Sequence, residues 1–497
     1  MASAALPPTQ APKEEYAGDE INALVLDPGS YTTRAGFAGE DTPKSVVPTH
    51  YGLLSSGEHV YGENAIHLPR GDMEIQNPYG TDGLVEDWDT ASKLWEYSIT
   101  SRLTGARQTP PSRNGLNDTK DENGDVHMDE AMEQMQDEQD RALAEYPLLM
   151  SEPGWNPQKA REKTMEIAME EWGVPAFFLA KNGQLAAYAN GKATALVVDV
   201  GHHNTSVTAL WEGMVLRKSL MKSPLAGSFL NAQIRQMFST LQPPAPLIPH
   251  YMVKSKAPVD AGAPSNATYT QYAAPPKESF RKLEEDRVLT SFKESVVQCW
   301  QGPGRLENNM DSVKYAPPRP FEMPDGWNQV FGMERYKVAE GFFDARSAYP
   351  LPPDSGLETP KGEDTIPSVI HRSLNACDVD TRAHLLANVI LTGAGSLIEK
   401  LPERLQADLQ SLYPNPRVRV IANSNSVERK YGAWIGGSVL GSLGTFHQMW
   451  VSREEYKEYG PGIVEKRCKM PKTHFRYVSD APETTYEYYV CGLGWDY

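Results

Sequence analysis

The chain has 497 residues, and its 65 acidic against 48 basic side chains give a formal net charge of −17. This length exceeds what one compact core usually organises, so two or more lobes are expected. The negative charge argues against strong independent DNA binding and leaves basic proteins as charged partners. No apolar run reaches the roughly 20 residues of a membrane span, so no membrane partner is expected. The 4 cysteines are too widely spaced for a disulfide framework or a metal-ligand pair.

Residues 1–20 are rich in Pro, Ala and charged residues and predict a disordered leader. The first ordered element is the apolar run ALVLDPG at residues 23–29, and the run ALVVDVG repeats its pattern at 195–201. Each run is typical of a buried strand that ends in a tight glycine turn. Two such hairpins facing each other can hold a nucleotide's phosphates, with Asp27 and Asp199 reaching a hydrated Mg²⁺. Two unrelated buried strands are the alternative.

An acidic insertion separates the two runs. A helix is predicted at 88–103, and residues 117–140 then carry ten acids against one base, Lys120. Such a run is most often a solvated loop, and the alternative is a contact for a basic tail or helix. Order is expected to resume at Tyr146 with a strand at 147–150 and a helix at 157–171.

Prolines divide the second half of the chain. Eight prolines at 241–276 favour a spacer loop without regular elements, and a helix is predicted at 278–300. Further Pro-rich stretches cover 316–324 and 350–367. A strand at 388–391 then runs into Thr392-Gly-Ala-Gly-Ser396, a third Gly-rich turn that favours the nucleotide interpretation. No structure is predicted for the aromatic-rich residues 469–497.

Several separate blocks resemble the actin family in order and spacing. They are RAGFAGEDTPKSVVP (34–48), GLVEDWDTASKLW (83–95), NPQKAREK (156–163), KYGAWIGGS (430–438) and TFHQMWVSREEY (445–456). The resemblance covers Ala23 to Cys468 and implies the two-lobed α/β fold of actin, Hsp70 and sugar kinases, with ATP in the cleft between the lobes. The implied first lobe is 21–185 with an insertion at 104–145, the second lobe is 186–427, and 428–468 return to the first.

The resemblance also assigns the phosphate loops and shows where this chain departs from actin. Residues that match the family's phosphate and metal positions are Asp27, Gly29, Ser30, Asp199 and Gly201; Arg34 replaces a Lys, Tyr31 a Gly and His202 an acid. Asn182 stands at the position of a water-positioning Gln, and Ser206 at that of its partner His. Since a misplacement of ~1 Å can lower a rate 10²-fold, we expect bound ATP, with Mg²⁺, and very weak or absent hydrolysis. An active actin-like ATPase is the alternative.

Around the base and ribose of the nucleotide, the resemblance implies contacts from residues on a helix, in a Gly-rich turn and from one further lysine. These residues are Lys293, Glu294, Thr392, Gly393, Ala394, Gly395 and Lys430. Without the resemblance, a surface ion pair would be the ordinary interpretation of Lys293 and Glu294.

Two further features concern assembly. The connection between Tyr51 and Tyr61 is short where actin carries a longer loop that grips a neighbouring subunit, so the chain is expected not to polymerise. The resemblance places five residues on a groove that takes an amphipathic helix: Tyr188, Leu440, Leu443, Thr445 and Met449. Core packing is an equal alternative for the two leucines.

Within the family, the DPGS loop, the SEPGWNP block (151–157) and the acidic insertion resemble a nuclear branch. This likeness implies a nuclear subunit of chromatin-remodelling and histone acetyltransferase complexes. It also implies pairing with nuclear actin on a helix of a large ATPase or scaffold subunit, and a contribution to histone or nucleosome binding. A filament-capping protein, and a histone chaperone acting through residues 117–140, are the alternatives.

Overall fold

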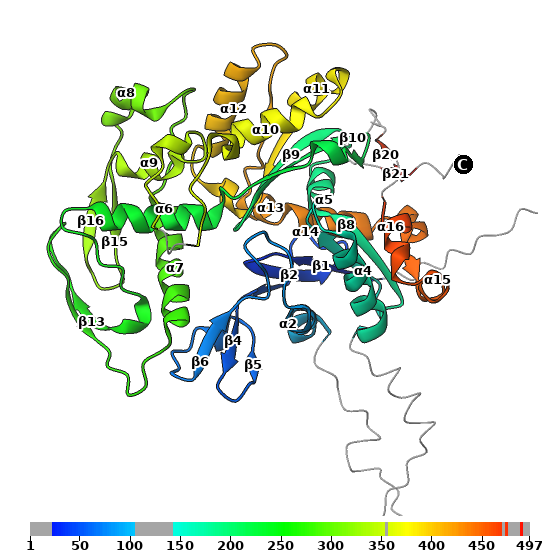
Figure 1. The fold of residues 1–497 in the computed structure, drawn as a ribbon, viewed down its shortest axis with the longest axis horizontal. Coiled ribbons are helices and arrows are strands. Elements are labelled where there is room, and N and C mark those ends of the chain that lie inside the picture. The colour runs from blue at the N-terminus through cyan, green and yellow to red at the C-terminus, as the bar shows by residue number, and fades with distance from the viewer. Residues whose placement is uncertain (1–21, 105–142, 353–355, 470–472, 476–487, 491–497) are drawn as a thin grey trace, which may run out of the picture.

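The computed structural model describes residues 22–104, 143–352, 356–469, 473–475 and 488–490. Two sheets lie side by side, each covered by helices, and the chain passes from the first to the second and back (Figure 1). The predicted leader at 1–20 and almost all of the acidic insertion at 104–145 lie outside the described residues. Among the described helices, none has the length and apolar character needed to cross a membrane.

The first sheet carries the first phosphate hairpin. Its strands, in spatial order, are β19 (Val451–Ser452), β8 (Ala176–Lys181), β7 (Leu148–Glu152), β1 (Leu24–Pro28), β2 (Thr32–Phe37) and β3 (Ser45–Pro48). β1, β7 and β8 are parallel, and β1, β2 and β3 form an antiparallel meander. Helix α2 (Trp88–Ile99) packs against this sheet through the fully buried Trp95 and continues into a π-helical turn, so it confirms the helix predicted at 88–103.

The second sheet carries the second hairpin and the Gly-rich turn. Its strands are β11 (Met214–Val215), β10 (Thr205–Trp211), β9 (Ala195–Val200), β17 (Val389–Thr392) and β18 (Val420–Ile421), with β12 (Met221–Ser223) beside β10. β9, β17 and β18 are parallel. Its core includes side chains from α6 (Gly227–Thr240), α7 (Glu278–Ser295), α10 (Ile366–Asn375) and α12 (Leu401–Leu412). Because α7 ends at Ser295, it is five residues shorter than the helix predicted at 278–300.

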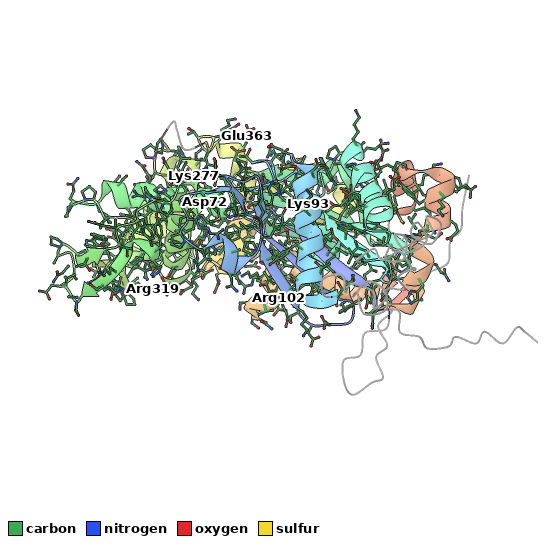
Figure 2. The ribbon with its side chains drawn as sticks, turned by 90° about the horizontal axis from the view of Figure 1, so that it is seen from below. Asp72, Lys93, Arg102, Lys277, Arg319 and Glu363 are labelled. Atoms are coloured by element: carbon green, nitrogen blue, oxygen red, sulfur yellow. The ribbon has the colours of Figure 1, made fainter. Side chains whose placement is uncertain are left out.

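Other elements surround these two sheets. A small sheet of β5 (His59–Val60), β4 (Tyr51–Leu54) and β6 (Met73–Gln76) follows the first hairpin, with α1 (Glu63–Ile66). In the view from below, Lys93 lies on α2 and Arg102 on the π-helical turn after it, and Asp72 beside the small sheet lies near Lys277 at the start of α7 (Figure 2). The remaining helices are α4 (Gln158–Glu166), α5 (Asn182–Ala189), α8 (Met310–Lys314), α9 (Glu334–Glu340), α11 (Val379–Leu386), α13 (Ser426–Lys430), α14 (Gly432–Gly441), α15 (Arg453–Tyr459) and α16 (Val464–Arg467).

Helices α5 and α14 lie against each other between the two sheets (Figure 1). A Cβ atom on Gly436 would stand 1.8 Å from the backbone oxygen of Leu185, so only glycine permits this close approach. The indole Nε1 of Trp434 donates to the backbone oxygen of Val25 at 3.1 Å, which ties α14 to β1. The predicted lobe boundary at 185/186 falls inside α5, so the chain crosses there as continuous helix.

The expectation that residues 241–276 hold no regular elements is wrong. β13 (Val253–Ala257) and β14 (Asn266–Tyr269) form an antiparallel hairpin there. The proline-free runs between Pro249 and Pro258, and between Pro264 and Pro275, are long enough for short strands.

The other two Pro-rich stretches also contain regular structure. β15 (Arg319–Glu322) lies inside 316–324 and pairs with β16 (Asn328–Phe331), where Pro320 is tolerated because both strands are sheet edges. In 350–367, α10 begins at Ile366 with Pro367 in its first turn, where a missing backbone N–H does no harm.

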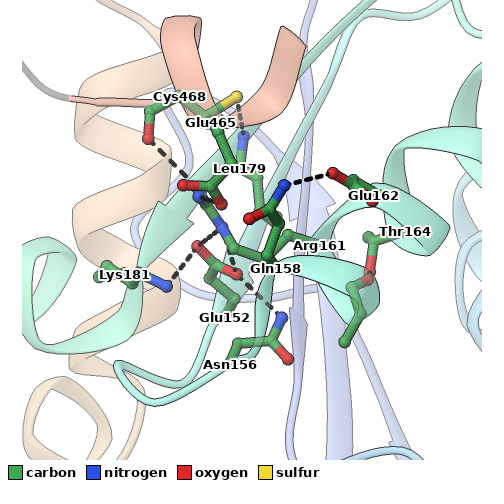
Figure 3. Close-up of polar contacts among 11 residues, drawn as sticks. Glu152, Asn156, Gln158, Arg161, Glu162, Thr164, Leu179, Lys181, Glu465 and Cys468 are labelled. Carbon is green, nitrogen blue, oxygen red and sulfur yellow. Dashed lines mark hydrogen bonds and ion pairs between the residues drawn. The ribbon is translucent and has the colours of Figure 1, made fainter. Parts of the chain in front are cut away.

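A buried ionic network attaches α16 to the first sheet (Figure 3). Glu152, at the end of β7, accepts from Arg161 Nε at 2.9 Å and from Lys181 Nζ at 2.8 Å. Arg161 also pairs with Glu465 of α16 and donates to the backbone oxygen of Cys468 at 3.3 Å. Beyond it, the two strands β20 (Thr473–Phe475) and β21 (Tyr488–Val490) pair, and β21 lies beside the 3₁₀ helix Gly444–Met449.

Candidate functional site

The first hairpin closes tightly beneath a buried carboxylate. Asp27 accepts from Arg34 Nη1 at 2.7 Å, across the β1–β2 ladder, and from the hydroxyl of Ser151 at 2.5 Å. At the turn, the N–H of Gly29 donates to the oxygen of Thr32, and a Cβ on Gly29 would lie 2.7 Å from that oxygen. The turn therefore requires glycine, and it leaves backbone amides close to any ligand above it.

The second hairpin has the same plan and joins the third Gly-rich turn. The N–H of Gly201 donates to the oxygen of Asn204 at 3.0 Å. Asp199 is in register with Thr392 of the parallel strand β17. The next residue, Gly393, has a φ of 88°, and a Cβ there would stand 2.3 Å from Asp199 Oδ1. Only glycine combines this backbone conformation with this contact.

The two hairpins bring their carboxylates into one region. Burial and the negative charge of Asp27 together raise the pKa of Asp199 to about 6, and the Arg34 guanidinium partly opposes both effects. The negative charge of Asp27 acts on Asp199 because the two carboxylates lie near each other. The pair that the sequence predicts at the metal position therefore faces a common space.

Aromatic rings fill part of that space. The ring of Tyr31 stacks on the imidazole of His202, with centroids 4.5 Å apart and planes inclined by 29°. His203 packs against His202 at 4.6 Å, and His50 meets Tyr31 edge-on at 5.9 Å. Burial lowers the pKa of His202 well below its usual value, and the charges of the neighbouring basic groups lower it further. His202 is therefore neutral at physiological pH, unlike the acid that it replaces.

The two residues at the water-positioning places lie beside Asp199. Asn182 begins α5, where its side-chain oxygen accepts from the N–H of Gly183 at 2.8 Å and its Nδ2 donates to Asp199 Oδ2 at 3.3 Å. Ser206 is buried on β10 directly opposite Asp199. Both side chains therefore lie at the site, and the amide of Asn182 is held by two contacts within the protein.

On the helical side, Lys293 of α7 points to the start of α6. Its ammonium donates to Asn231 Oδ1 at 2.8 Å and to the backbone oxygen of Gly227 at 3.4 Å. Burial lowers the pKa of Lys293 to about 8, and Asp286 and Glu294 partly oppose that shift. The N–H of Gly227 in turn donates to the oxygen of Gly201, which links Lys293 to the second hairpin. Glu294 is exposed.

The third turn is held by α13. The hydroxyl of Thr392 and the N–H of Gly393 both donate to the backbone oxygen of Arg429 at 3.0 Å. Ala394 begins a short 3₁₀ helix, and a Cβ on Gly395 would stand 2.6 Å from Val200 of the second hairpin. Lys430 follows Arg429, with its ammonium over the ring of Tyr431 at 5.4 Å.

Three buried polar atoms at this site have no hydrogen-bond partner within the described part of the chain. They are Arg34 Nε, His203 Nδ1 and Ser228 Oγ. Buried donors and acceptors are normally paired, so these atoms are free to bind a ligand. Together with the glycine turns of both hairpins, they fit a phosphate-bearing nucleotide.

The five groove residues are mostly buried in the free chain. Tyr188, Leu440 and Met449 are 4%, 5% and 7% exposed, and the latter two belong to the core around the first sheet. Leu443 is half-buried and Thr445 is exposed. A docking helix would therefore meet Leu443 and Thr445 first.

Sequence reasoning missed several supporting residues. Ser151, which holds Asp27, stands at the carboxyl end of the strand beside β1, and that position was a usable signal. The Ser30 backbone oxygen accepts from Asn77 Nδ2 at 2.9 Å, and Asn231 holds Lys293; neither contact has a local sequence signal. These contacts depend on how distant segments pack.

This fold, with its two sheets that each carry a glycine-turn hairpin, is of the actin type. The chain matches the Actin family over residues 18–469 and belongs to the actin family. The predicted two-lobed actin-like α/β fold is thereby confirmed, and the family generally binds ATP.

Particular relatives are closely similar along their whole length. Actin-related protein 4 of Emericella nidulans is 52% identical over 480 residues, covering 94% of this chain and 100% of the relative. Actin-related protein 4 of Gibberella zeae is 48% identical over 478 residues, with 94% and 100% covered. A Schizosaccharomyces pombe protein named SWI/SNF and RSC complexes subunit arp42 is 35% identical over 475 residues, with 91% and 100% covered. The predicted likeness to the nuclear actin-related branch is therefore confirmed.

Proposed function

We propose that this chain is a nuclear, non-polymerising subunit of chromatin-remodelling and histone acetyltransferase complexes, with ATP as a largely structural ligand. Support for the complex comes from the name of the arp42 relative, which is 35% identical over 91% of this chain. Support for the structural role of ATP comes from the altered catalytic positions.

The residues that we propose to hold the nucleotide are those of the two hairpins, the third Gly-rich turn and α7. Backbone amides of the two glycine turns and the Arg34 side chain face the phosphates, and Asp27 and Asp199 hold Mg²⁺ through water. Lys293, Glu294, the turn 392–395 and Lys430 take the ribose and base. Bound Mg²⁺ neutralises charge on the phosphates. A ligand present at a thousand times its Kd stabilises the folded state by about 4 kcal/mol without any chemistry.

The proposed structural role of ATP rests on the contacts that the side chain of Asn182 makes. Its amide is held by Asp199 and by the start of its own helix, and Ser206 replaces the partner His. In-line attack needs a water held within fractions of an ångström, and neither side chain extends far enough to hold one there.

Native mass spectrometry of the purified chain, followed for hours with Mg²⁺-ATP, tests this role. We expect a persistent 1:1 ATP complex without conversion to ADP. The N182Q/S206H variant restores the longer amide and the imidazole, and we expect it to release phosphate at least tenfold faster. Steady turnover by the unaltered chain would instead favour the active ATPase.

For partners, we propose nuclear actin, a helix of a large remodeller ATPase or scaffold subunit, and histones. An amphipathic helix suits the groove at Leu443 and Thr445, and the −17 charge suits basic partners. Purification of the tagged chain from its own cells should recover actin and one large helical subunit in equal amounts. Recovery of cytoskeletal filaments in their place would favour the filament-capping alternative.

A further inference from the structure

The chain passes the proposed docking groove directly after its last helix. One wall of that groove is the 3₁₀ helix Gly444–Met449, which we call the groove wall. Arg467, at the end of α16, donates from Nη2 to the backbone oxygen of Gln448 on this wall at 3.2 Å. The backbone oxygen of the next residue, Cys468, accepts from Arg161 at 3.3 Å. The chain beyond Cys468 therefore begins beside the groove wall.

The chain comes back to the same wall at Tyr488. Strands β20 and β21 are antiparallel, with Thr473 opposite Val490 and Phe475 opposite Tyr488. Of this pair, β21 lies beside the groove wall, and Figure 1 shows both strands close to α16. The C-terminal segment is thus placed at the groove twice, where it leaves α16 and again at β21.

The hairpin of β20 and β21 needs a surface to pack against. Within the described residues these two strands form a sheet of their own, without a third strand. A two-stranded hairpin is only marginally stable in water, and packing against another element is what stabilises it. The groove wall is the surface that the structure places beside β21.

The composition of this segment suits an apolar groove. Residues 470–497 lie beyond the Actin family match, which ends at 469. From β21 onward, the large apolar and aromatic residues of the segment are Tyr488, Tyr489, Val490, Leu493, Trp495 and Tyr497. Tyr and Trp dominate binding energy at interfaces because each buries a large area with few rotatable bonds. The half-buried Leu443 and the buried Met449 supply apolar surface on the groove side.

A segment tethered to its own binding site has an advantage over a free ligand. A short flexible tether gives an effective concentration of ~1 mM, so a segment with an intrinsic Kd of ~0.1 mM would fill the groove about ten times as often as leave it empty. A partner that binds the same groove must displace the segment first, and its apparent affinity then falls about tenfold.

We propose that the C-terminal segment around β21 occupies the docking groove when no partner is bound, and that a partner helix must displace it. This proposal rests on helix docking at the groove, as proposed above. It assigns to residues beyond the family match the role of an intramolecular ligand.

A native cysteine reports on this contact. Cys491 directly follows β21, and Thr445 on the groove wall is exposed. A disulfide requires Cα atoms within about 7 Å of each other. We expect the oxidised T445C chain to form an intramolecular disulfide with Cys491 in most molecules, measured by peptide mapping without reductant. The described native cysteines 299, 377 and 468 are buried and free.

The matched control is S239C, which places a thiol on an exposed residue of α6 in the second lobe. It should give less than a tenth of the disulfide yield of T445C. Equal yields in the two variants would contradict the proposal, because the segment would then have no preference for the groove. A disulfide between two chains in T445C would also contradict it, and would indicate that the segment reaches a second copy.

Binding of the segment as a separate peptide tests occupancy without any cross-link. The probe is a fluorescein-labelled peptide of residues 470–497, followed by anisotropy. The full-length variant Y488S/Y489S/W495S has a weakened segment of its own, and we expect it to bind the probe at least tenfold more tightly than the unaltered chain does. Equal binding by both chains would mean that the groove is not occupied by the segment.

Displacement is tested by purifying the tagged full-length chain and the same triple variant from their own cells. We expect the variant to recover several times more of the large helical subunit. Equal recovery, with the disulfide and the peptide binding as expected, would overturn displacement alone. If neither chain recovers a helical subunit, the proposed docking function fails, and the disulfide still decides whether the segment occupies the groove.

Discussion

Arg34 pairs with one anion, Asp27, and in the proposed function it also faces the phosphates of the nucleotide. Its Nη1 pairs with Asp27, while its Nε has no partner among the described residues. A guanidinium has donors for both the carboxylate and a phosphate, whereas an ammonium is a single compact charge. This difference makes the Lys-to-Arg replacement at this position consequential.

Substitution of Arg34 should therefore weaken ATP binding strongly. In R34M, Asp27 is left buried beside the phosphates without its cation, and we expect Kd for Mg²⁺-ATP to rise at least tenfold by calorimetry. R34K, which keeps the charge, should retain most of the affinity. Equal affinity in R34M and the unaltered chain would mean that the phosphates do not lie at this hairpin.

His50 makes the stability of the chain sensitive to acid. Burial, together with the charges of His203 and His67, lowers its pKa to about 4. The unfolded chain binds a proton at the ordinary pKa of about 6.5, so between pH 6.5 and 4 it binds more protons than the native chain. Stability should therefore fall as the pH falls through this window, and the contribution is fully present above it.

The measurement is the denaturation midpoint of the unaltered chain and of H50Q from pH 7 to pH 4. The advantage of the unaltered chain over H50Q should shrink steadily with acidification. A difference that stays constant over this range would show that His50 does not titrate differently in the native state.

At the scale of elements, the packing of α14 on α5 depends on one glycine. In G436A, the added methyl group would meet a backbone oxygen at 1.8 Å, and overpacking of this severity should lower the free energy of unfolding by about 3 kcal/mol. G444A is the control, because no atom lies within 4 Å of a Cβ there. Chemical denaturation of both variants compares them, and equal midpoints would contradict this interpretation.

The ionic network beside α16 makes a second prediction at this scale. Arg161 and Glu152 have side chains only 5% and 2% exposed, so R161M leaves the buried carboxylate of Glu152 with Lys181 as its one cation and with the amide of Asn156. Amide exchange in Val464–Arg467 should become roughly hundredfold faster. K163M removes an exposed pair with Glu166 and should leave exchange there unchanged. Unchanged exchange in R161M would mean that other contacts hold α16.

At the scale of the whole molecule, the connection between β4 and β5 bears on assembly. It is a turn at residues 55–58, closed by the N–H of Gly57 donating to the oxygen of Leu54 at 2.9 Å. No long loop extends from the small sheet toward a neighbouring subunit in this described segment. A filament needs two complementary surfaces that repeat, so loss of one prevents growth.

Ultracentrifugation in Mg²⁺ and KCl should therefore leave the chain in the supernatant at concentrations where actin pellets. The control is actin itself in the same buffer. A pellet of this chain alone would contradict the non-polymerising assignment, and its appearance only after actin is added would indicate filament binding.

The sequence by itself determined the fold class and the two hairpins that end in glycine turns. These features depend on local patterns, such as an apolar run that ends at Asp27 and Gly29. They also depend on sequence blocks that resemble the actin family in the same order and spacing. The same local rules failed at 241–276, because prolines bounded two short strands rather than excluding them. These local rules also did not predict that Tyr188 and Met449 are buried.

Only the tertiary structure decided which distant residues meet. Met73 and Phe280 lie on different lobes and pack together, and no periodicity in either segment predicts this contact. Likewise, the stacking of Tyr31 on His202 needs both hairpins in place. Such contacts arise when two surfaces exclude water together, and that depends on the shape of the whole chain rather than on any one segment.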